Sequence, residues 1–500
     1  MRANDMRLLT KPIEKRLNTP LLFISLATIL LLVLFVILGL NKTKLGFPLD
    51  DAWIHQTYAR NLVEHGSWSF VPGVVSGGST SPLWTLLLSP GFLIGGNFYF
   101  YWTLSISALL FLGLVIIVCK SYANFIPEPN KIQIIILGLI VGLEWHLQWA
   151  AASGMETIAF SCVIVLITFL STGRDLKWWL IGIASGLLLW IRPDGLTIIG
   201  PIAFLILDKL IKKQINAKKL AEFAIPFVLI LFGYFLFNYL TTGQVFPNTF
   251  YAKQMEYQEL LGIPLGERIF TEFSPLWVGV CLFLIPGFLF SMAVSIKKRD
   301  LGMLGFPIWV IGYVFLFAVR LPVIYQHGRY IIPVIPLFIL FGYWGTANLL
   351  AQIIDQRKNR FASVGVLGLL LTISIAFYLQ GIKAYQTDLE VIDTFMVQPA
   401  NWVKENTSPD ALIAAHDIGA MGFFAQRNLL DLAGLVNPEV IPFIRDEGNI
   451  HDYIIEKEAE YFVCFNDWYQ HSDEWGEVIK SYIMINGEND KKVEIIKLKY

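Results

Sequence analysis

The sequence predicts an all-α polytopic membrane protein with about eleven transmembrane helices, followed by a small C-terminal α/β domain outside the cytoplasm. Composition gives the first reason, because the 500 residues are 55% hydrophobic and 15% charged, whereas soluble domains are about 25% charged. Charge distribution gives the second: residues 381–500 carry 10 Lys and Arg against 21 Asp and Glu, and residues 1–380 carry 28 against 18. The third is a series of long apolar runs that ends near residue 380.

The apolar runs predict where the chain crosses the bilayer, since each crossing needs about 20 mostly apolar residues. Residues 1–19 are basic, and the run that follows them is too long for a signal-peptide core and has no small-residue cleavage site, so we predict an uncleaved span. The predicted spans are 20–40, 98–119, 132–150, 157–172, 178–191, 196–210, 222–241, 273–296, 303–320, 330–350 and 361–380.

Basic residues predict the sidedness, because cytoplasmic loops are enriched in Lys and Arg. With a cytoplasmic N-terminus and alternating spans, 20 of the 28 basic residues before residue 381 face the cytoplasm. A full span at 82–95 would reverse every later loop, so we expect a re-entrant or outer-leaflet helix there, or an extension of the second span. The expected organisation in the cell's cytoplasmic membrane is a cytoplasmic N-terminus (1–19), a transmembrane domain (20–384) with a first outer loop at 41–97, and an extracytoplasmic domain (385–500).

An acid pair, Asp50 and Asp51, begins a helical pattern in the first outer loop, and Gly66 is the expected end of that helix. One interpretation is structural: Asp50 caps the helix and Asp51 complements its dipole. The other is chemical, because a carboxylate at a membrane interface can accept a proton from a hydroxyl or hold a divalent cation such as Mg²⁺ or Ca²⁺. Two carboxylates are too few to predict a metal site.

Further polar residues collect at the same predicted outer face. Glu156 enters an apolar span, where an acid is costly. Arg192 and Asp194 either pair with each other or contact a substrate. The residues that we consider for substrate contact at this face are His55, Ser79, Thr80, Glu156, Asp194, Asn248 and Tyr251.

Cations at the outer face have two interpretations. Lys253, His327 and Arg329 can extend toward lipid headgroups, or they can bind a phosphate, for which Arg offers a bidentate fork and Lys a point charge. Because three such residues stand within a few loops, we weigh lipid-headgroup contact and phosphate binding equally.

Seven motifs in sequence order, between residues 46 and 438, resemble the GT-C superfamily of integral-membrane glycosyltransferases, and most closely the branch of mycobacterial cell-wall arabinofuranosyltransferases. The motifs are PLDDAWIHQTYARN, GSTSPLW, SGMET, RPDG, FPNTFYAK, HGRY, and HDIGAMGFF followed by LLDLAGLVNP. The resemblance implies transfer of a sugar, with inversion, from a polyprenyl-phosphate-linked donor to a hydroxyl of a cell-envelope glycan, lipid or protein.

The resemblance also implies roles for residues. Asp50 or Asp51 would be the catalytic base, with a slight preference for Asp50 because the family's acid stands at the start of the loop. The donor phosphate would contact the outer cations, which are Lys253, Arg329, His327 and Arg192. The residue types suit this chemistry, since a carboxylate base contributes roughly 10²–10⁴-fold and a departing phosphate needs positive charge more than a proton.

The C-terminal region mixes strand and helix patterns. We expect strands near 411–415, 461–465, 481–485 and 492–500, and helices at 390–405 and 450–459. His416 and Asp417 could reach an acceptor. For Asp417 and Asp431 we favour a structural interpretation, in which each side chain organises its own turn.

Three alternatives remain at this point. A flippase or transporter for a lipid-linked sugar would place polar residues near the bilayer midplane and often show an internal repeat, and we find no repeat. An oligosaccharide ligase shares the lipid-phosphate chemistry, so only the order of the motifs argues against it. A non-enzymatic membrane scaffold would not need a buried acid such as Glu156 or a set of cations at the outer face, so these residues argue against it. Four scattered Cys predict no disulfide framework or zinc site, and the scattered basic residues give no support for nucleic-acid binding.

Overall fold

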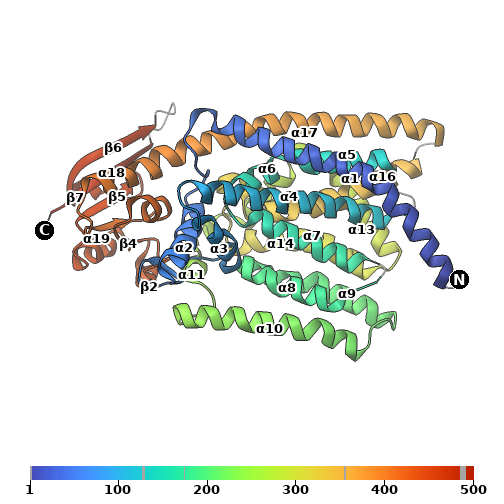
Figure 1. Ribbon diagram of the computed structural model, residues 1–500, viewed down its shortest axis with the longest axis horizontal. Helices are drawn as coiled ribbons and strands as arrows, with labels where there is room; N and C mark the ends of the chain where they lie inside the picture. The colour runs from blue at the N-terminus through green and yellow to red at the C-terminus, as the bar shows by residue number, and fades with distance from the viewer. Residues whose placement is uncertain (1–2, 127–129, 174, 354–355, 485–490, 500) are drawn as a thin grey trace.

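The computed structural model describes residues 3–126, 130–173, 175–353, 356–484 and 491–499. Most of these residues are helical (Figure 1). The helices are α1 (Ala3–Gly39), α2 (Asp51–His65), α3 (Pro82–Leu88), α4 (Phe98–Phe125), α5 (Lys131–Leu143), α6 (Trp145–Ala152), α7 (Thr157–Thr172), α8 (Trp178–Ile191), α9 (Ile199–Ile211), α10 (Ala217–Thr242), α11 (Asn248–Glu256), α12 (Leu265–Glu272), α13 (Gly279–Lys297), α14 (Leu301–Arg320), α15 (Tyr325–Gly328), α16 (Ile335–Ile353), α17 (Gln356–Ile392), α18 (Gln398–Asn406) and α19 (Glu447–Glu456).

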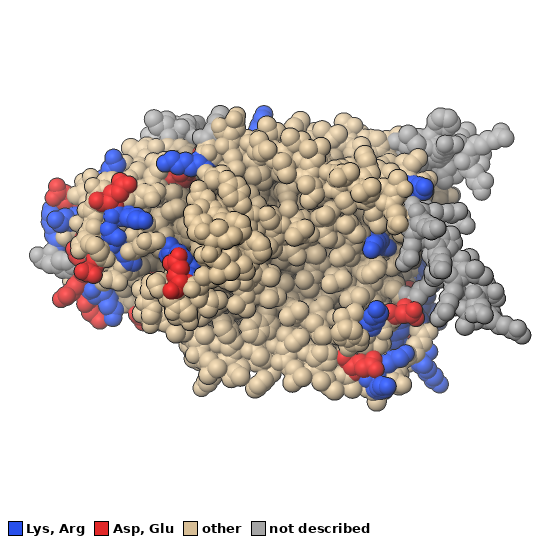
Figure 2. Space-filling model, in the orientation of Figure 1, with Lys and Arg blue, Asp and Glu red and all other residues tan. Residues whose placement is uncertain are grey.

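The long helices form a bundle with the small domain at one end. In Figure 1 the C-terminal domain lies at the left, the N-terminus at the right, and α2, α3 and α11 lie between the bundle and the domain. Figure 2 shows charged side chains gathered at the two ends of the visible face, with a broad and nearly uncharged band between them. This is the surface expected of a protein whose middle lies in a bilayer.

Seven of the described helices are long and apolar enough to cross a membrane, and the pair α5 and α6, bent by 54°, makes an eighth if it counts as one span. Helices also lie at the other predicted spans, but α7, α8 and α9 have only 16, 14 and 13 residues. At 1.5 Å per residue, none of the three covers a hydrocarbon core of about 30 Å. The count of eleven spans is therefore not confirmed.

The segment predicted to be re-entrant or an extension of the second span is a short helix. α3 covers only Pro82–Leu88 and is followed by a 3-10 turn at Ser89–Phe92, before α4 begins at Phe98. α3 packs against α2 and α8. It is too short to cross a bilayer as a separate span.

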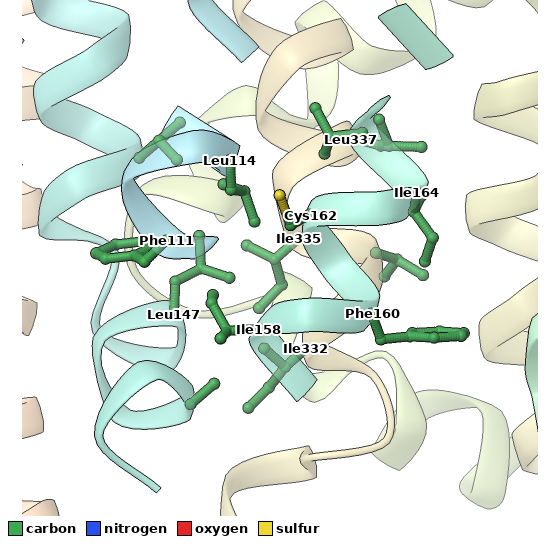
Figure 3. Packing of buried hydrophobic residues seen from close by; sticks show 14 of the residues in the cluster. Phe111, Leu114, Leu147, Ile158, Phe160, Cys162, Ile164, Ile332, Ile335 and Leu337 are labelled. Atoms are coloured by element: carbon green, nitrogen blue, oxygen red, sulfur yellow. The ribbon is translucent and has the colours of Figure 1, made fainter. Parts of the chain in front are cut away.

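The apolar core holds the starts of two helices that carry polar residues. Figure 3 shows Ile158 and Phe160 of α7 beside Ile332 and Ile335, and the latter two lie just before and at the start of α16. All four side chains are fully buried. α16 is the central helix, and it approaches α13 so closely that a Cβ on Gly345 would lie 1.8 Å from the Gly287 carbonyl oxygen. Small residues permit such close helix packing in membranes. The core therefore fixes the chain around Glu156 and Arg329.

The C-terminal domain is a five-stranded mixed sheet with the order β4-β3-β5-β7-β6. β3 pairs in parallel with β4 and β5, while β7 pairs antiparallel with β5 and β6. The predicted strands correspond to β3, β5, β6 and β7, and β4 was not predicted. The strands are β3 (Leu412–Ala415), β4 (Asn428–Asp431), β5 (Tyr461–Phe465), β6 (Gly476–Met484) and β7 (Lys491–Leu498). A separate hairpin between α2 and α3 consists of β1 (Ser69–Val71) and β2 (Val74–Val75).

Candidate active site

Asp50 directly precedes α2, which ends at Gly66 as expected, with φ of 64°. In the part of the chain that the structure describes, the Asp50 side chain makes no capping bond to α2. Its two oxygens instead accept hydrogen bonds from the backbone N–H groups of Gly419 (2.6 Å) and Ala420 (2.7 Å) in the C-terminal domain. Burial and the nearby Asp417 raise the pKa of Asp50 to about 8, in spite of the two hydrogen bonds.

Asp51, in contrast, faces two cations. Its Oδ2 accepts hydrogen bonds from Lys253 Nζ (3.2 Å) and from Arg329 Nη2 (2.5 Å). Burial alone would raise the pKa of Asp51, but the charges of Arg329 and Lys253 outweigh burial and hold this pKa well below its usual range. Asp51 also raises the pKa of Lys253 above its usual value, against the effect of burial. The three groups therefore form an ion cluster at the start of α2.

Tyr330 lies at the centre of these cations and is missing from the residues predicted for the site. Its hydroxyl oxygen accepts hydrogen bonds from Lys253 Nζ (3.0 Å) and Arg329 Nη2 (3.1 Å). Its ring lies 5.0 Å from the Arg329 guanidinium, 5.7 Å from Lys253 Nζ and 5.3 Å from the Arg192 guanidinium. Cation–π attraction adds to the charge pairing. In the sequence it is the last residue of the motif HGRY, directly after Arg329.

A second polar group lies around Glu156, which precedes α7. Arg192 donates from Nε to Asp194 Oδ1 (3.0 Å), and its Nη1 lies 3.9 Å from Glu156 Oε1. Glu156 Oε2 lies 3.5 Å from His55 Nε2, and the other ring nitrogen of His55 is 3.2 Å from Ser79 Oγ. The tautomer of His55 decides which atom donates there. The predicted pairing of Arg192 with Asp194 is thus present within a larger network.

One cavity of about 340 Å³ connects the two groups. Phe246, Phe250 and Phe317 make its wall mainly apolar. Leu316 and Arg320 of α14 line the cavity and are also exposed at the surface. Of the residues predicted for the site, seven line this cavity: Asp51, Thr80, Glu156, Arg192, Asp194, Lys253 and Arg329.

Other predicted residues do not line this cavity. His55 and Ser79 lie behind Glu156, and Asn248 Nδ2 donates to the Leu435 carbonyl oxygen (3.2 Å) in the C-terminal domain. Tyr251 packs edge-on against Phe250.

His327 is held away from the cavity. His327 Nε2 lies 2.7 Å from Asp388 Oδ2, and the ring lies 5.1 Å from the Trp145 ring and 5.4 Å from the Trp149 ring. Its φ is 60°, a conformation that a non-glycine residue adopts only when its surroundings impose it. His327 therefore orders the turn that precedes Arg329.

A Mg²⁺ or Ca²⁺ ion does not fit the acid pair. Asp51 already faces two cations, and both Asp50 oxygens accept backbone hydrogen bonds. Among the residues that the structure describes, no group of three or more His, Cys, Asp or Glu could hold a metal ion. These cations prefer six or more oxygen ligands, so the chemistry below is derived without one.

The Arg329 guanidinium keeps unused donors. The residue is 4% exposed, and within the described ranges its Nε and Nη1 have no hydrogen-bond partner. A buried donor without a partner costs about 1–3 kcal/mol, and more when it is charged.

In its fold, the helical bundle with the small terminal domain is similar to solved structures of low sequence identity. ArnT from Cupriavidus metallidurans, bound to undecaprenyl phosphate, is 13% identical, with a TM-score of 0.55 over 93% of this chain and 97% of that chain. The oligosaccharyltransferase of Archaeoglobus fulgidus, tethered with an acceptor peptide, is 14% identical, with a TM-score of 0.57 over 89% and 69%. At such identities the likeness shows the fold.

The arabinofuranosyltransferase AftD from Mycobacteria is 14% identical over 96% of this chain and 40% of that chain, but its TM-score of 0.44 carries no argument about the branch. A family model described as a domain of unknown function, DUF8728, matches residues 380–496. No curated protein matches the chain.

Proposed function

We propose that this protein is a GT-C glycosyltransferase that moves a sugar from a polyprenyl-phosphate-linked donor to a hydroxyl of a cell-envelope glycan, lipid or protein. The observation that carries the proposal is the pairing of Asp51 with Lys253 and Arg329 in one cavity. A carboxylate beside two cations supplies both groups that the transfer needs: a proton acceptor for the incoming hydroxyl and positive charge for the departing phosphate.

The donor phosphate would bind Lys253 and Arg329. Arg329 offers a guanidinium whose Nε and Nη1 have no hydrogen-bond partner among the described residues, and Lys253 offers a compact positive charge. ArnT, which has the same fold, was crystallised with undecaprenyl phosphate. An entrance beside the exposed Leu316 and Arg320 would let the lipid tail stay in the membrane while the phosphate enters the cavity.

Asp51 is the better placed of the two candidate bases, because it lines the cavity while Asp50 is occupied by the C-terminal domain. As long as Lys253 and Arg329 hold Asp51, its low pKa makes it a weak base. A phosphate that takes over these cations releases Asp51, and its pKa then rises. Donor binding would thereby activate the base.

The reaction is a single displacement. The acceptor oxygen attacks the anomeric carbon while Asp51 takes the hydroxyl proton, and the bond between that carbon and the phosphate oxygen breaks. The lipid phosphate leaves as an anion on Lys253 and Arg329, and the new glycosidic bond has inverted configuration. Glu156, Arg192 and Asp194 on the other wall would bind the hydroxyls of the donor sugar.

The size of the cavity favours a donor with one sugar over an oligosaccharide. At about 340 Å³, it lies near the small end of the range for ligand pockets, roughly 300–1,000 Å³. The test is transfer by the purified protein from a panel of synthetic polyprenyl-phosphate sugars, each with one sugar or a short oligosaccharide. Transfer from a single-sugar donor is expected, and failure with every lipid-linked donor would contradict the proposal.

We predict that the C-terminal domain lies outside the cytoplasm, as the basic loops indicate. Alkaline phosphatase, which is active only outside the cytosol, is expected to be active when it is fused to the C-terminus. A fluorescent protein that matures only in the cytosol is expected to stay dark there. A bright fluorescent fusion with an inactive phosphatase would reverse the orientation.

A further inference from the structure

The C-terminal domain that matches DUF8728 contacts the outer loops at residues of the predicted motifs. These contacts come from residues Gly419–Phe423 and Leu435, which we call the docking face. The loop residues that donate or accept hydrogen bonds there are Asp50, Arg60 and Asn248.

The first contact joins Asp50 to the domain. Its two side-chain oxygens accept from two successive backbone N–H groups, Gly419 and Ala420, at the start of a helical segment. The backbones meet here as well, because a Cβ on Gly419 would lie 2.1 Å from the Asp50 carbonyl oxygen. Only glycine permits this approach.

The second contact lies further along α2. Arg60 donates from Nη1 to the Phe423 carbonyl oxygen (2.7 Å) and from Nη2 to that of Gly422 (3.3 Å). The Trp53 ring lies 4.9 Å from the Phe423 ring. These bonds hold α2 at a second point, so that its rotation about Asp50 is restricted while Asp51 faces the cavity.

The third contact lies on α11, the helix that carries Lys253. Asn248, at the start of this helix, donates to the Leu435 carbonyl oxygen (3.2 Å). Thr249 donates to the Gly78 carbonyl oxygen (2.9 Å) in the first outer loop. The same domain therefore holds both the helix of Asp51 and the helix of Lys253.

We infer that the docking face is a structural part of the active site: through Asp50 and Arg60 it places Asp51, and through Asn248 it places Lys253. These three loop residues are positioning residues, and the domain of unknown function thereby has a role in catalysis. The inference rests on the proposed function for its catalytic part, but the docking contact itself can be measured without activity.

Two variants test the contact at Asp50. Asp50→Asn replaces one accepting oxygen by an NH₂ group, which cannot accept a hydrogen bond from the backbone N–H that faces it. Gly419→Ala inserts a methyl group between the two backbones. In the purified full-length protein, both are expected to speed amide hydrogen exchange in residues 416–425 by roughly tenfold, the change for one lost hydrogen bond of about 1.4 kcal/mol. Exchange in α13 and α16 should not change, which shows that the bundle is folded.

Activity gives a second readout, which a merely structural role would not produce. Both variants are expected to lower kcat by about 10²-fold, the cost of a misplacement of about 1 Å, without raising the donor KM, because Lys253 and Arg329 remain. Asn248→Leu is expected to raise the donor KM, because it removes one of the contacts that hold the helix of Lys253.

Matched controls lie in the same domain, away from the docking face. Asp446 caps α19 by accepting from the Asn449 N–H (3.0 Å), and a Cβ on Gly448 would meet its nearest atom only at 3.4 Å. Asp446→Asn and Gly448→Ala should keep wild-type kcat and wild-type exchange in residues 416–425.

Unchanged exchange in residues 416–425 in both test variants would overturn the docking contact. Faster exchange with wild-type kcat would overturn the positioning role. An inactive Asp50→Asn beside a fully active Gly419→Ala would overturn it too, and make Asp50 itself the base. Faster exchange together with a wild-type protein that transfers no sugar supports the docking contact and contradicts only the proposed function.

Discussion

Asp51→Asn is expected to abolish sugar transfer and at the same time to tighten the binding of polyprenyl phosphate. The amide cannot take the acceptor proton, so the rate should fall by about 10²–10⁴-fold. The same change removes the negative charge that competes for Lys253 and Arg329. Charge-assisted hydrogen bonds contribute about 1.5–3 kcal/mol, so about tenfold tighter binding, or roughly 1.4 kcal/mol, is expected.

The measurement pairs single-turnover transfer with binding of a fluorescent polyprenyl phosphate to the purified protein. Asp208→Asn is the matched control, because Asp208 is also buried and paired, with its Oδ1 2.7 Å from Lys212 Nζ, but it does not line the cavity. This control should keep wild-type transfer and binding. Weaker lipid binding by Asp51→Asn would show that Asp51 does not compete with the phosphate, and full activity would remove it as the base.

The polar residues that meet at the cavity could be predicted because a bilayer makes misplaced charge costly. Glu156 and Arg192 stand out in apolar surroundings, and the basic loops predict the orientation of the chain. The cavity does bring them close to Lys253 and Arg329. The predicted topology alone places these polar residues at one face of the membrane, and it needs no knowledge of how the helices pack.

The roles of the two adjacent acids could not be predicted, because the difference lies in distant backbone atoms. Asp50 is held by the N–H groups of Gly419 and Ala420, and no spacing in the first loop encodes that contact. His327 is a similar case, since its partner Asp388 lies on α17. Tyr330 stands in the motif HGRY, but nothing in the sequence shows that its hydroxyl lies between Lys253 and Arg329.

The strand assignments missed a short strand, and the count of eleven spans is not confirmed because several helices are short. β4 has four residues and no alternating pattern, so periodicity could not identify it. α7 and α8 are too short to cross a bilayer, yet the surrounding helices bury most of α7. Helices that are enclosed by other helices need not match the thickness of the hydrocarbon core, and composition does not reveal that enclosure.

Arg329→Gln is expected to weaken the binding of polyprenyl phosphate by about 10²-fold, equivalent to about 2.7 kcal/mol. The variant loses a buried guanidinium whose Nε and Nη1 are free for an anion, and it leaves Asp51 with Lys253 as its only cation partner among the described residues. Arg329→Lys should recover part of this loss, because it restores the charge but not the fork. Binding of the fluorescent lipid phosphate measures both.

Arg320→Gln separates this effect from a general loss of positive charge. Arg320 lines the same cavity, but it is exposed and donates to Gln254 Oε1 (3.2 Å), and exposed charge pairs contribute only about 0–1 kcal/mol. Its loss should therefore change binding by no more than about fivefold. If Arg329→Gln bound the lipid phosphate as tightly as Arg320→Gln does, the phosphate would have to lie away from the Asp51 cluster. Asp51 would then keep its cations throughout the reaction, and it would be too weak a base for the proposed transfer.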